Sequence, residues 1–492
     1  MFQTVSPIRI ARLPYARRSA ALLLLAVILA GCASSDGLST RATPAKPEEL
    51  KAEKTLGAAA AGPWPAADWW KRFGDPQLDA LVDEALKGSP NMRLAQARVD
   101  RASATVLAAG AAFWPTASAG LDSTRQRYSA NGIFPPPIAG GTFTTTNIGV
   151  SFGYEFDFWG RNRAAYEAAI GREQAAQADV FAARLVLSSA IAAAYVQLSR
   201  SFDQLDIARR TLEEREAIQR LTTQRVSAGL DSKLELKQVE TSIPAARARV
   251  AQIEEEIALE RNQLAALAGQ GPDRGLALER PKIAAEPVAL PSALPADLLG
   301  RRPDVVASRL RVEAAARDVT VTKAAFYPNV NLSALLGYQS ISWSKLLQPE
   351  SAVPSIGFAI RLPLFDAGRL RGELAGRHAD YDVAVEQYNQ SLVDALREVV
   401  DQLASWRSLE TQRSEVDLAL GSAEEAYQLA TTRYQGGLGT LLQVIAAEMA
   451  VLEQRSLRAD LQARAATVSI NLAKALGGGF MDADAQRPEP KR

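Results

Sequence analysis

The chain has 492 residues, of which 47% are hydrophobic, 23% charged and 7% aromatic. This is the composition of a folded protein and excludes global disorder. The 56 basic and 55 acidic residues nearly balance, so no strong field favours nucleic acid as a partner. With one cysteine and one histidine, a disulfide within the chain is impossible and a Cys/His metal site is not expected.

Residues 1–31 read as a secretory signal peptide. An arginine-rich start precedes the apolar run Ala20–Ala30, which is shorter than the roughly 20 residues that cross a membrane. The run ends in Leu29-Ala-Gly-Cys32, which resembles a bacterial lipobox, whose cysteine is acylated and becomes the new N-terminus. The alternative is an ordinary signal peptide with an incidental cysteine. Because the only cysteine stands at the lipobox position, we expect acyl chains on Cys32 to anchor the chain in a lipid bilayer.

The chain after the signal peptide contains an internal sequence repeat. Ala111-Ala-Phe-Trp-Pro115 matches Ala324-Ala-Phe-Tyr-Pro328 at an offset of 213 residues, and Gly160-Arg-Asn-Arg163 matches Gly368-Arg-Leu-Arg371 at an offset of 208. The boundaries that follow from these matches are a lipid-anchored linker over 32–62, a first repeat over 63–268, a connector over 269–303, a second repeat over 304–476 and a polar tail over 477–492.

Each repeat is predicted to contain two long helices, over about 161–226 and 233–268 in the first and over about 369–434 and 441–476 in the second. Their apolar residues follow the alternating three- and four-residue spacing of coiled coils. An ordinary amphipathic helix in a globular core is the alternative. Globular helices usually run about 8–20 residues, whereas a helix over 161–226 would extend about 100 Å.

Four segments alternate apolar and polar residues and are predicted to be strands, over about 116–127, 143–158, 329–341 and 355–365. Strands of roughly 10 residues with one apolar face suit an outer-membrane barrel, although a soluble sheet with one buried face is the alternative. Small barrels need about eight strands, so four strands could close a barrel only with more than one chain.

Four stretches carry a family resemblance: Trp69-Trp-Lys-Arg-Phe-Gly-Asp-Pro-Gln-Leu78, Leu294-Pro-Ala-Asp-Leu-Leu-Gly-Arg-Arg-Pro-Asp304, Ala324-Ala-Phe-Tyr-Pro328 and Leu364-Phe-Asp-Ala-Gly-Arg369. Together with the repeat and the lipobox, they resemble the TolC-like outer membrane efflux channels, in the lipidated NodT-type branch. The resemblance implies a mainly α protein with transmembrane β structure. Four strands per chain would form a trimeric twelve-stranded barrel, continued by a long periplasmic α-helical coiled-coil barrel.

The function implied by the resemblance is passive export of small toxic compounds. An inner-membrane pump, expected to be proton-driven, would supply the energy through a periplasmic adaptor, and the homotrimer would sit in the outer membrane with a large periplasmic part. Ala33 after the lipobox cysteine, in place of aspartate, also favours the outer membrane by resemblance to bacterial sorting rules. We expect no enzyme activity, because the sequence contains no P-loop, G-x-S-x-G or H-E-x-x-H motif.

Three other functions remain open from the sequence. The alternative within the same fold is the outer-membrane duct of a type I protein secretion system, which the lipobox disfavours. A structural coiled-coil lipoprotein would leave the four strands unexplained. A lipid-anchored enzyme has no catalytic constellation to support it.

The turns between the paired long helices are candidate docking sites. By resemblance they form the periplasmic tip that meets the adaptor. The alternative is a simple connection between helices, in which glycine permits a positive φ at the helix end. The candidate docking residues are Arg225, Gly229, Leu230, Arg433, Gly437 and Leu438.

A pore constriction is expected near the same turns. The family often carries an aspartate just after the second turn, but this chain has Gly439 there and Asp231 in the first half. Asp231 could supply three carboxylates to a trimeric cation-selective constriction, or it could cap the next helix. In the second case, apolar and hydrogen-bonded contacts that include Leu438 and Leu442 would hold the gate.

Charged residues near the predicted strands are candidates for the barrel lumen. Glu155, Asp157 and Arg361 alternate with apolar residues, so we expect them to point inward, with a rim position as the alternative. His378 is expected at the surface of a long helix. Trp64, Trp69, Trp70 and Phe73 are expected to pack in a periplasmic belt rather than to form a membrane girdle.

Overall fold

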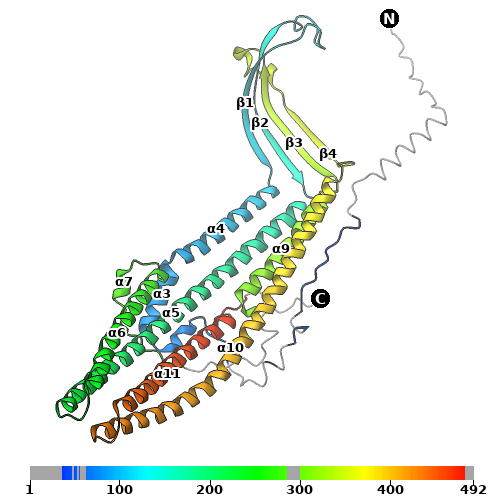
Figure 1. The fold of residues 1–492 in the computed structure, drawn as a ribbon. Helices are drawn as coiled ribbons and strands as arrows, with labels where there is room; N and C mark the ends of the chain where they lie inside the picture. The colour runs from blue at the N-terminus through cyan, green and yellow to red at the C-terminus, as the bar shows by residue number, and fades with distance from the viewer. Residues whose placement is uncertain (1–35, 47–48, 52–54, 56–62, 285–299, 483–492) are drawn as a thin grey trace, which may run out of the picture. The chain divides into compact units, whose positions relative to one another are not determined.

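The computed structural model describes residues 36–46, 49–51, 55, 63–284 and 300–482. The predicted signal peptide, Cys32, most of the linker, residues 285–299 of the connector and the end of the tail lie outside these ranges. The described chain is mainly helical, with one four-stranded antiparallel sheet, as predicted (Figure 1).

The chain forms two compact units, and both draw on both sequence repeats. The first contains residues 102–173 and 311–386 together with the described residues up to Thr43. The second contains the described residues of 44–101, 174–310 and 387–492. The two repeats of the sequence are therefore not two separate compact units.

The sheet lies in the first unit, and its strands follow chain order. The first repeat contributes β1 (Thr116–Arg127) and β2 (Thr142–Phe156), and the second contributes β3 (Asn329–Ser340) and β4 (Ser355–Arg361). β4 ends four residues before the predicted end at 365. Pro363 lies in that stretch, and a proline has no N–H to donate to a strand ladder.

One face of the sheet is apolar and the other is polar. Directly paired residues share a face, and the register pairs Leu121 with Ile148, Val150 with Leu336 and Leu332 with Phe358. On the opposite face, Ser118 bonds to Ser151 and Asn147 donates to Asp122. The apolar side chains are left exposed in the single chain, with Ile356 and Phe358 both 78% exposed.

Aromatic side chains gather at the helix end of the strands, where Tyr154 and Phe156 lie on the apolar face. Trp159 stacks on Tyr327, with ring centroids 4.6 Å apart, and Phe156 stacks on Phe158 at 5.7 Å. Aromatic girdles of this kind mark the edges of the apolar band in outer-membrane barrels. The arrangement is that of a membrane-spanning sheet.

The helices form two long hairpins. The first joins α5 (Arg161–Ser227) to α6 (Lys233–Leu267), and the second joins α10 (Arg369–Gln435) to α11 (Leu441–Ala475) (Figure 1). The shorter helices α4 (Pro90–Gly110) and α9 (Pro303–Ala324) precede β1 and β3. The predicted long helices are thus present, within two residues of their expected ends.

The described part of the linker runs along α10. In the first unit, the Arg371 side chain donates to the backbone oxygen of Asp36 at 3.2 Å, and the Asp382 carboxylate accepts the backbone N–H groups of Arg41 and Ala42, each at 3.0 Å. In the second unit, Ala45 donates its backbone N–H to Asn389 at 2.7 Å. Backbone hydrogen bonds therefore hold the polar linker at both places.

An aromatic core organises the second unit. The 3-10 helix η2 (Trp69–Phe73) and α3 (Pro76–Gly88) bury their apolar side chains against α5, α6 and α11. Trp69 and Trp70 meet edge to face, 5.9 Å apart, and Arg301 lies over the Trp64 ring at 4.7 Å. These aromatic residues serve packing, as predicted, and not a membrane girdle.

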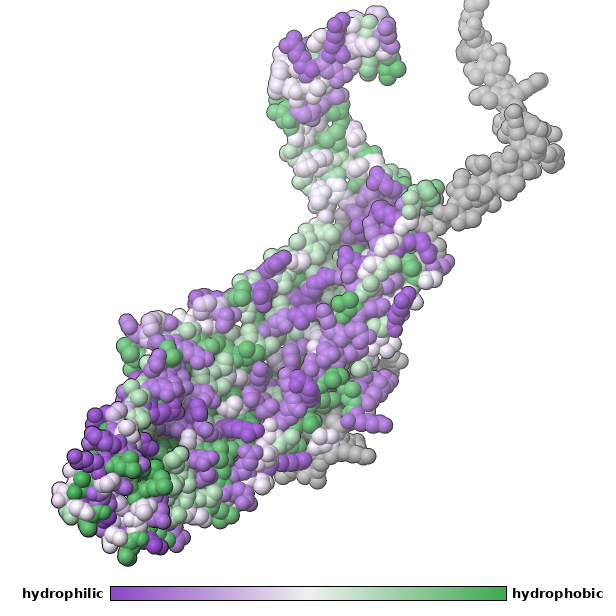
Figure 2. Space-filling model, viewed as in Figure 1, coloured by the Kyte–Doolittle hydropathy of each residue, from purple (hydrophilic) through white to green (hydrophobic). Residues whose placement is uncertain are grey.

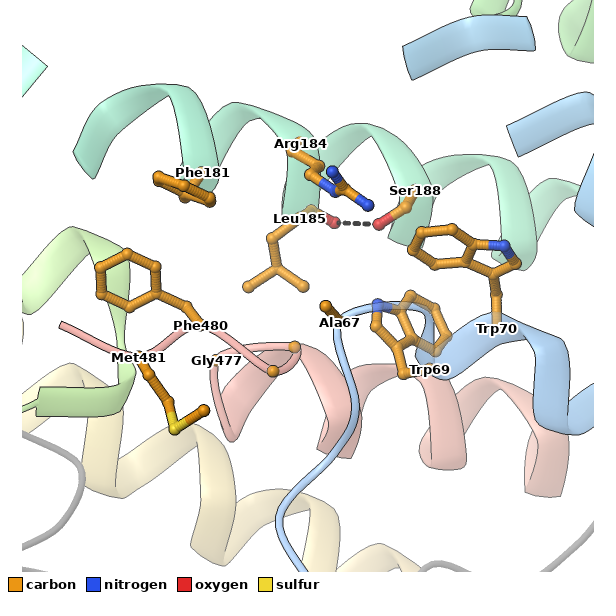
Figure 3. Close-up of a pocket in the computed structure, with 12 residues that line it drawn as sticks. Ala67, Trp69, Trp70, Phe181, Arg184, Leu185, Ser188, Gly477, Phe480 and Met481 are labelled. Carbon is orange, nitrogen blue, oxygen red and sulfur yellow. Dashed lines mark hydrogen bonds between the residues drawn. The ribbon is translucent and has the colours of Figure 1, made fainter. Parts of the chain in front are cut away.

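The start of the predicted polar tail, residues 477–482, is packed into this unit. Phe480 lies 5.1 Å from Phe181 of α5, and both line a pocket of about 290 Å³ with Trp69 and Leu185 (Figure 3). Asp482 donates its backbone N–H to the backbone oxygen of Gly300, and its carboxylate forms an ion pair with Arg309. Gly479 makes the close packing possible, because a Cβ there would lie 2.3 Å from the Ala66 backbone.

Replacing Gly479 should therefore destabilise the second unit. Gly479→Ala would force a side chain onto a backbone with φ +82° and into a clash, and we expect a fall in Tm of several degrees in detergent. Gly372→Ala is the matched control, because its Cβ meets nothing within 4 Å and it lies inside α10. Equal Tm values for the two variants would contradict the packed tail.

Candidate functional site

The two hairpin turns have the same backbone construction. At the first, Leu230 N–H bonds to Arg225 oxygen at 2.9 Å and Gly229 N–H to Val226 oxygen at 3.0 Å. The second repeats this pattern, from Leu438 to Arg433 at 2.8 Å and from Gly437 to Tyr434 at 3.1 Å. Each is a Schellman motif, which needs a left-handed residue after the helix. Gly229 and Gly437 supply it, with φ of 73° and 77°.

A polar network joins the two hairpins just behind these turns. Arg225 holds the Asp231 carboxylate with two hydrogen bonds, of 2.9 and 3.1 Å, and donates a third to the backbone oxygen of Tyr434 at 2.9 Å. The Tyr434 hydroxyl donates to Asp231 at 2.6 Å and lies 3.0 Å from the Thr222 hydroxyl. We call these four residues, Thr222, Arg225, Asp231 and Tyr434, the tip latch.

The tip latch is shielded from water. The side chains of Arg225 and Asp231 are each only 10% exposed, and Tyr434 is 1% exposed. The hydrogen bonds from Arg225 hold the pKa of Asp231 below its usual value, while burial and the bond to Asp231 raise the pKa of Tyr434. Asp231 is therefore ionised and Tyr434 protonated near neutral pH.

Further polar contacts connect the hairpins away from the turns. Arg215 of α5 lies 3.1 Å from Glu448 of α11, and Arg200 lies 2.7 Å from Asp460. Burial raises the pKa of Glu448, whose side chain is 4% exposed. Apolar residues of both hairpins, among them Ile218 and Leu441, share a core beside the tip latch. The two hairpins of one chain are thus packed together along this region.

The second turn lacks an equivalent latch. Its arginine, Arg433, corresponds to Arg225, but Gly439 stands where the first repeat has Asp231. Arg433 instead donates to the backbone oxygen of Leu438 at 3.3 Å. Leu230 and Leu438 of the turns are 66% and 76% exposed, and Leu442 in the first turn of α11 is 69% exposed.

The structure corrects the helix-cap interpretation of Asp231. α6 begins at Lys233, and its N-cap is Ser232, whose hydroxyl accepts the Leu234 N–H at 3.1 Å. Glu235 closes the capping box by accepting the Ser232 N–H at 2.9 Å. The Ser-x-x-Glu spacing was readable in the sequence, but it leaves no capping role for Asp231.

The charged residues near the strands fall into different roles. Glu155 is paired with Asn331 on the polar face and accepts a hydrogen bond from Asn329 at 2.6 Å; Arg361 is paired with Asn329 on the same face. Asp157 lies beyond the end of β2, and its carboxylate accepts the Arg163 N–H at 2.8 Å, in the first turn of α5. Asp157 thus caps a helix at the strand junction.

His378 is not the surface residue that the sequence suggested. It is 6% exposed, and neither ring nitrogen has a hydrogen-bond partner among the described residues. Burial and the nearby Lys323 lower the pKa of His378, so the neutral ring is favoured. Leu374 and Val385, one turn before it and two turns after it, are also buried. His378 therefore belongs to the packed face of α10.

The family model for outer membrane efflux proteins matches the chain twice, over residues 81–270 and 294–478. The chain belongs to the outer membrane efflux protein family. The two matches fall on the two repeats seen in the sequence. Family and fold are those of channel proteins rather than enzymes. The outer-membrane location of its relatives indicates that this protein also lies in the outer membrane, with a periplasmic part.

Curated relatives and solved structures agree with this membership. The multidrug resistance outer membrane protein MdtP of Shigella flexneri is 32% identical over 95% of this chain and 98% of its own. The fusaric acid resistance protein FusA of Burkholderia cepacia is 39% identical over 73% of this chain and 69% of its own. The crystal structure of the outer membrane protein VceC of Vibrio cholerae superposes with a TM-score of 0.80 at 39% identity, covering 85% of this chain and all of that one.

Arg225 should stabilise the first turn far more than Arg433 stabilises the second. Because Arg225→Gln removes a shielded charged pair, we expect amide hydrogen exchange over 225–231 to accelerate about tenfold or more. Arg433→Gln is the matched control and should leave exchange at its own turn nearly unchanged. Equal acceleration at both turns would show that the tip latch contributes no special stability.

Proposed function

We propose that the chain is one subunit of a homotrimeric outer-membrane duct that passively conducts small toxic compounds out of the cell. An inner-membrane pump, driven by protons, delivers the compounds, and a periplasmic adaptor protein links pump and duct. The observation that carries the proposal is a sheet with one apolar and one polar face and two open edges, β1 and β4.

The open edges support assembly from several chains. In a bilayer, each unpaired backbone N–H or C=O costs several kilocalories per mole, so a spanning sheet has to close on itself. Four strands are too few, whereas three copies supply twelve. Large apolar side chains left exposed on the helices, including Leu107 at 77% and Leu418 at 67%, give further surface for contacts between copies.

The two faces of the sheet support conduction through the interior. The apolar face would meet lipid, so the polar face would line the lumen, with Glu155 and Arg361 near its helix end. No nucleotide-binding motif occurs in the sequence, so the duct itself would be passive. Several relatives carry names of drug or toxin resistance, which supports small cargo over the alternative of type I protein secretion.

The tip latch is our candidate for the gate. It ties the first turn to the second hairpin through the Tyr434 bond to Asp231 and the Arg225 bond to the Tyr434 backbone oxygen, so weakening it would let the turns separate more easily. Gly439 and Leu442 would contribute to the constriction from the second turn. The exposed Leu230 and Leu438, beside Arg225 and Arg433 and set by Gly229 and Gly437, would offer the adaptor an apolar docking surface on a rigid frame.

Loosening the tip latch should open the channel. Tyr434→Phe removes a hydrogen bond to a charged group, worth about 1.5–3 kcal/mol, so the open fraction should rise by about tenfold or more. The measurement is conductance of the purified protein in a planar bilayer, without nucleotide or pump. Arg433→Gln is the control expected to conduct as the wild type does. Wild-type conductance in Tyr434→Phe would reject the gate, and no conductance in any form would reject the duct.

The gate should also respond to pH with a definite sign. Because the pKa of Asp231 is lowered in the folded chain, the stability that its carboxylate contributes is fully present above the ordinary value of about 4. That stability is lost only as the pH falls through the lowered pKa. The same bilayer measurement should show constant wild-type conductance from neutral pH down to about 4.

We further propose that acyl chains on Cys32, palmitate among them, add a lipid anchor to the assembly. Native mass spectrometry of the detergent-extracted protein should detect three chains, each beginning at Cys32 and carrying acyl mass. Cys32→Ser should lose the acyl mass and remain trimeric. An unmodified wild-type trimer would reject the anchor alone, whereas persistent acylated monomers would reject the composite barrel.

A further inference from the structure

The apolar face of the sheet ends in two arginines. Along β1, Leu121 is followed on the same face by Ser123, Arg125 and Arg127. The neighbouring strand turns polar at the same height, because Arg125 is paired with Thr144 and Arg127 with Thr142. The face that is apolar nearer the helices therefore ends in a polar border. We call this border the arginine rim and define it by Arg125 and Arg127.

Both arginine side chains are free to bind a partner. Each residue is exposed, and in the described ranges neither forms an ion pair or hydrogen bond through its side chain. They adjoin the hairpin loop that follows Arg127, at the end of the sheet away from the helices (Figure 1). Hydrophilic residues gather at this end of the strands, whereas paler and more hydrophobic residues follow their length (Figure 2).

The position of the arginine rim matches the headgroup layer of a membrane. Arg125 lies four residues beyond Leu121, or about 13 Å along a strand that rises roughly 3.3 Å per residue. With the usual strand tilt of about 35–45°, this places Arg125 about 10 Å above the last apolar residue of β1 on that face. The helices and the lipid-side aromatic residues lie at the other end, so the rim belongs to the outer leaflet.

We propose that Arg125 and Arg127 bind phosphate groups of the phosphorylated glycolipid in the outer leaflet. A guanidinium pairs with phosphate through short, charge-assisted hydrogen bonds, and cations at a membrane surface attract anionic headgroups. The Thr142 and Thr144 hydroxyls on the paired strand could add donors. In a trimer, the three β1 strands would place three such arginine pairs around the barrel, all at the same level of the membrane. The inference goes beyond the export function and needs only the membrane orientation of the sheet.

The test compares glycolipid binding by charge variants. The double variant Arg125→Gln/Arg127→Gln should retain at least several-fold less lipopolysaccharide than the wild type, counted as adducts by native mass spectrometry after mixing in detergent. Arg125→Lys/Arg127→Lys keeps both charges and should retain most of the binding. The matched control Arg220→Gln/Arg413→Gln removes two exposed cations from α5 and α10 and should bind as the wild type does.

A second arm isolates the phosphate. Dephosphorylated lipopolysaccharide should bind the wild type no better than intact lipopolysaccharide binds the glutamine double variant. Binding by that variant at the wild-type level would overturn the proposal, as would equal wild-type binding of the two lipids. Size-exclusion chromatography confirms assembly of each variant before mixing, and if the glutamine variant fails to assemble, the comparison of the two lipids on the wild type and the lysine variant decides the question.

Discussion

Backbone hydrogen bonding at the edges of the sheet is the constraint from which the assembly follows. A strand in water can leave its edge to solvent, but a strand in hydrocarbon cannot. In this chain β1 and β4 have partners on one side only, and their apolar side chains are exposed. The single chain is therefore an incomplete object, and the symmetry of its assembly determines what the polar face can enclose.

Much of this architecture could be predicted because it rests on local patterns. Alternation located the strands, and uninterrupted apolar spacing located the long helices. The tip latch escaped because it joins Asp231 to Tyr434, 203 residues away, and no local pattern connects them. The buried His378 was missed for the same reason, since tertiary contacts bury it. The Ser232–Glu235 capping box is different, because its signal was present in the sequence.

The two repeats have kept the same backbone at their turns and diverged in side chains. Both turns close with the same Schellman pattern, yet only the first has a carboxylate within reach of its arginine. The aromatic residue that completes the tip latch comes from the second repeat. Asp231 corresponds to Gly439 of the second repeat and Tyr434 corresponds to Val226 of the first, so each repeat supplies a polar group that the other lacks. The latch is a contact between repeats that neither repeat could make alone.

The linker bonds to α10 fix how far a lipid anchor could lie from the helices. Asp36 is held by Arg371, two residues after the start of α10, and only three residues separate it from Cys32. Four residue steps of extended chain reach at most about 14 Å. An acylated Cys32 would therefore be a short anchor. It would require the periplasmic surface of the outer membrane to pass close to the beginning of α10. β4 ends eight residues before α10 begins. The reach of the Cys32 anchor and the end of the apolar sheet would therefore indicate the same membrane boundary.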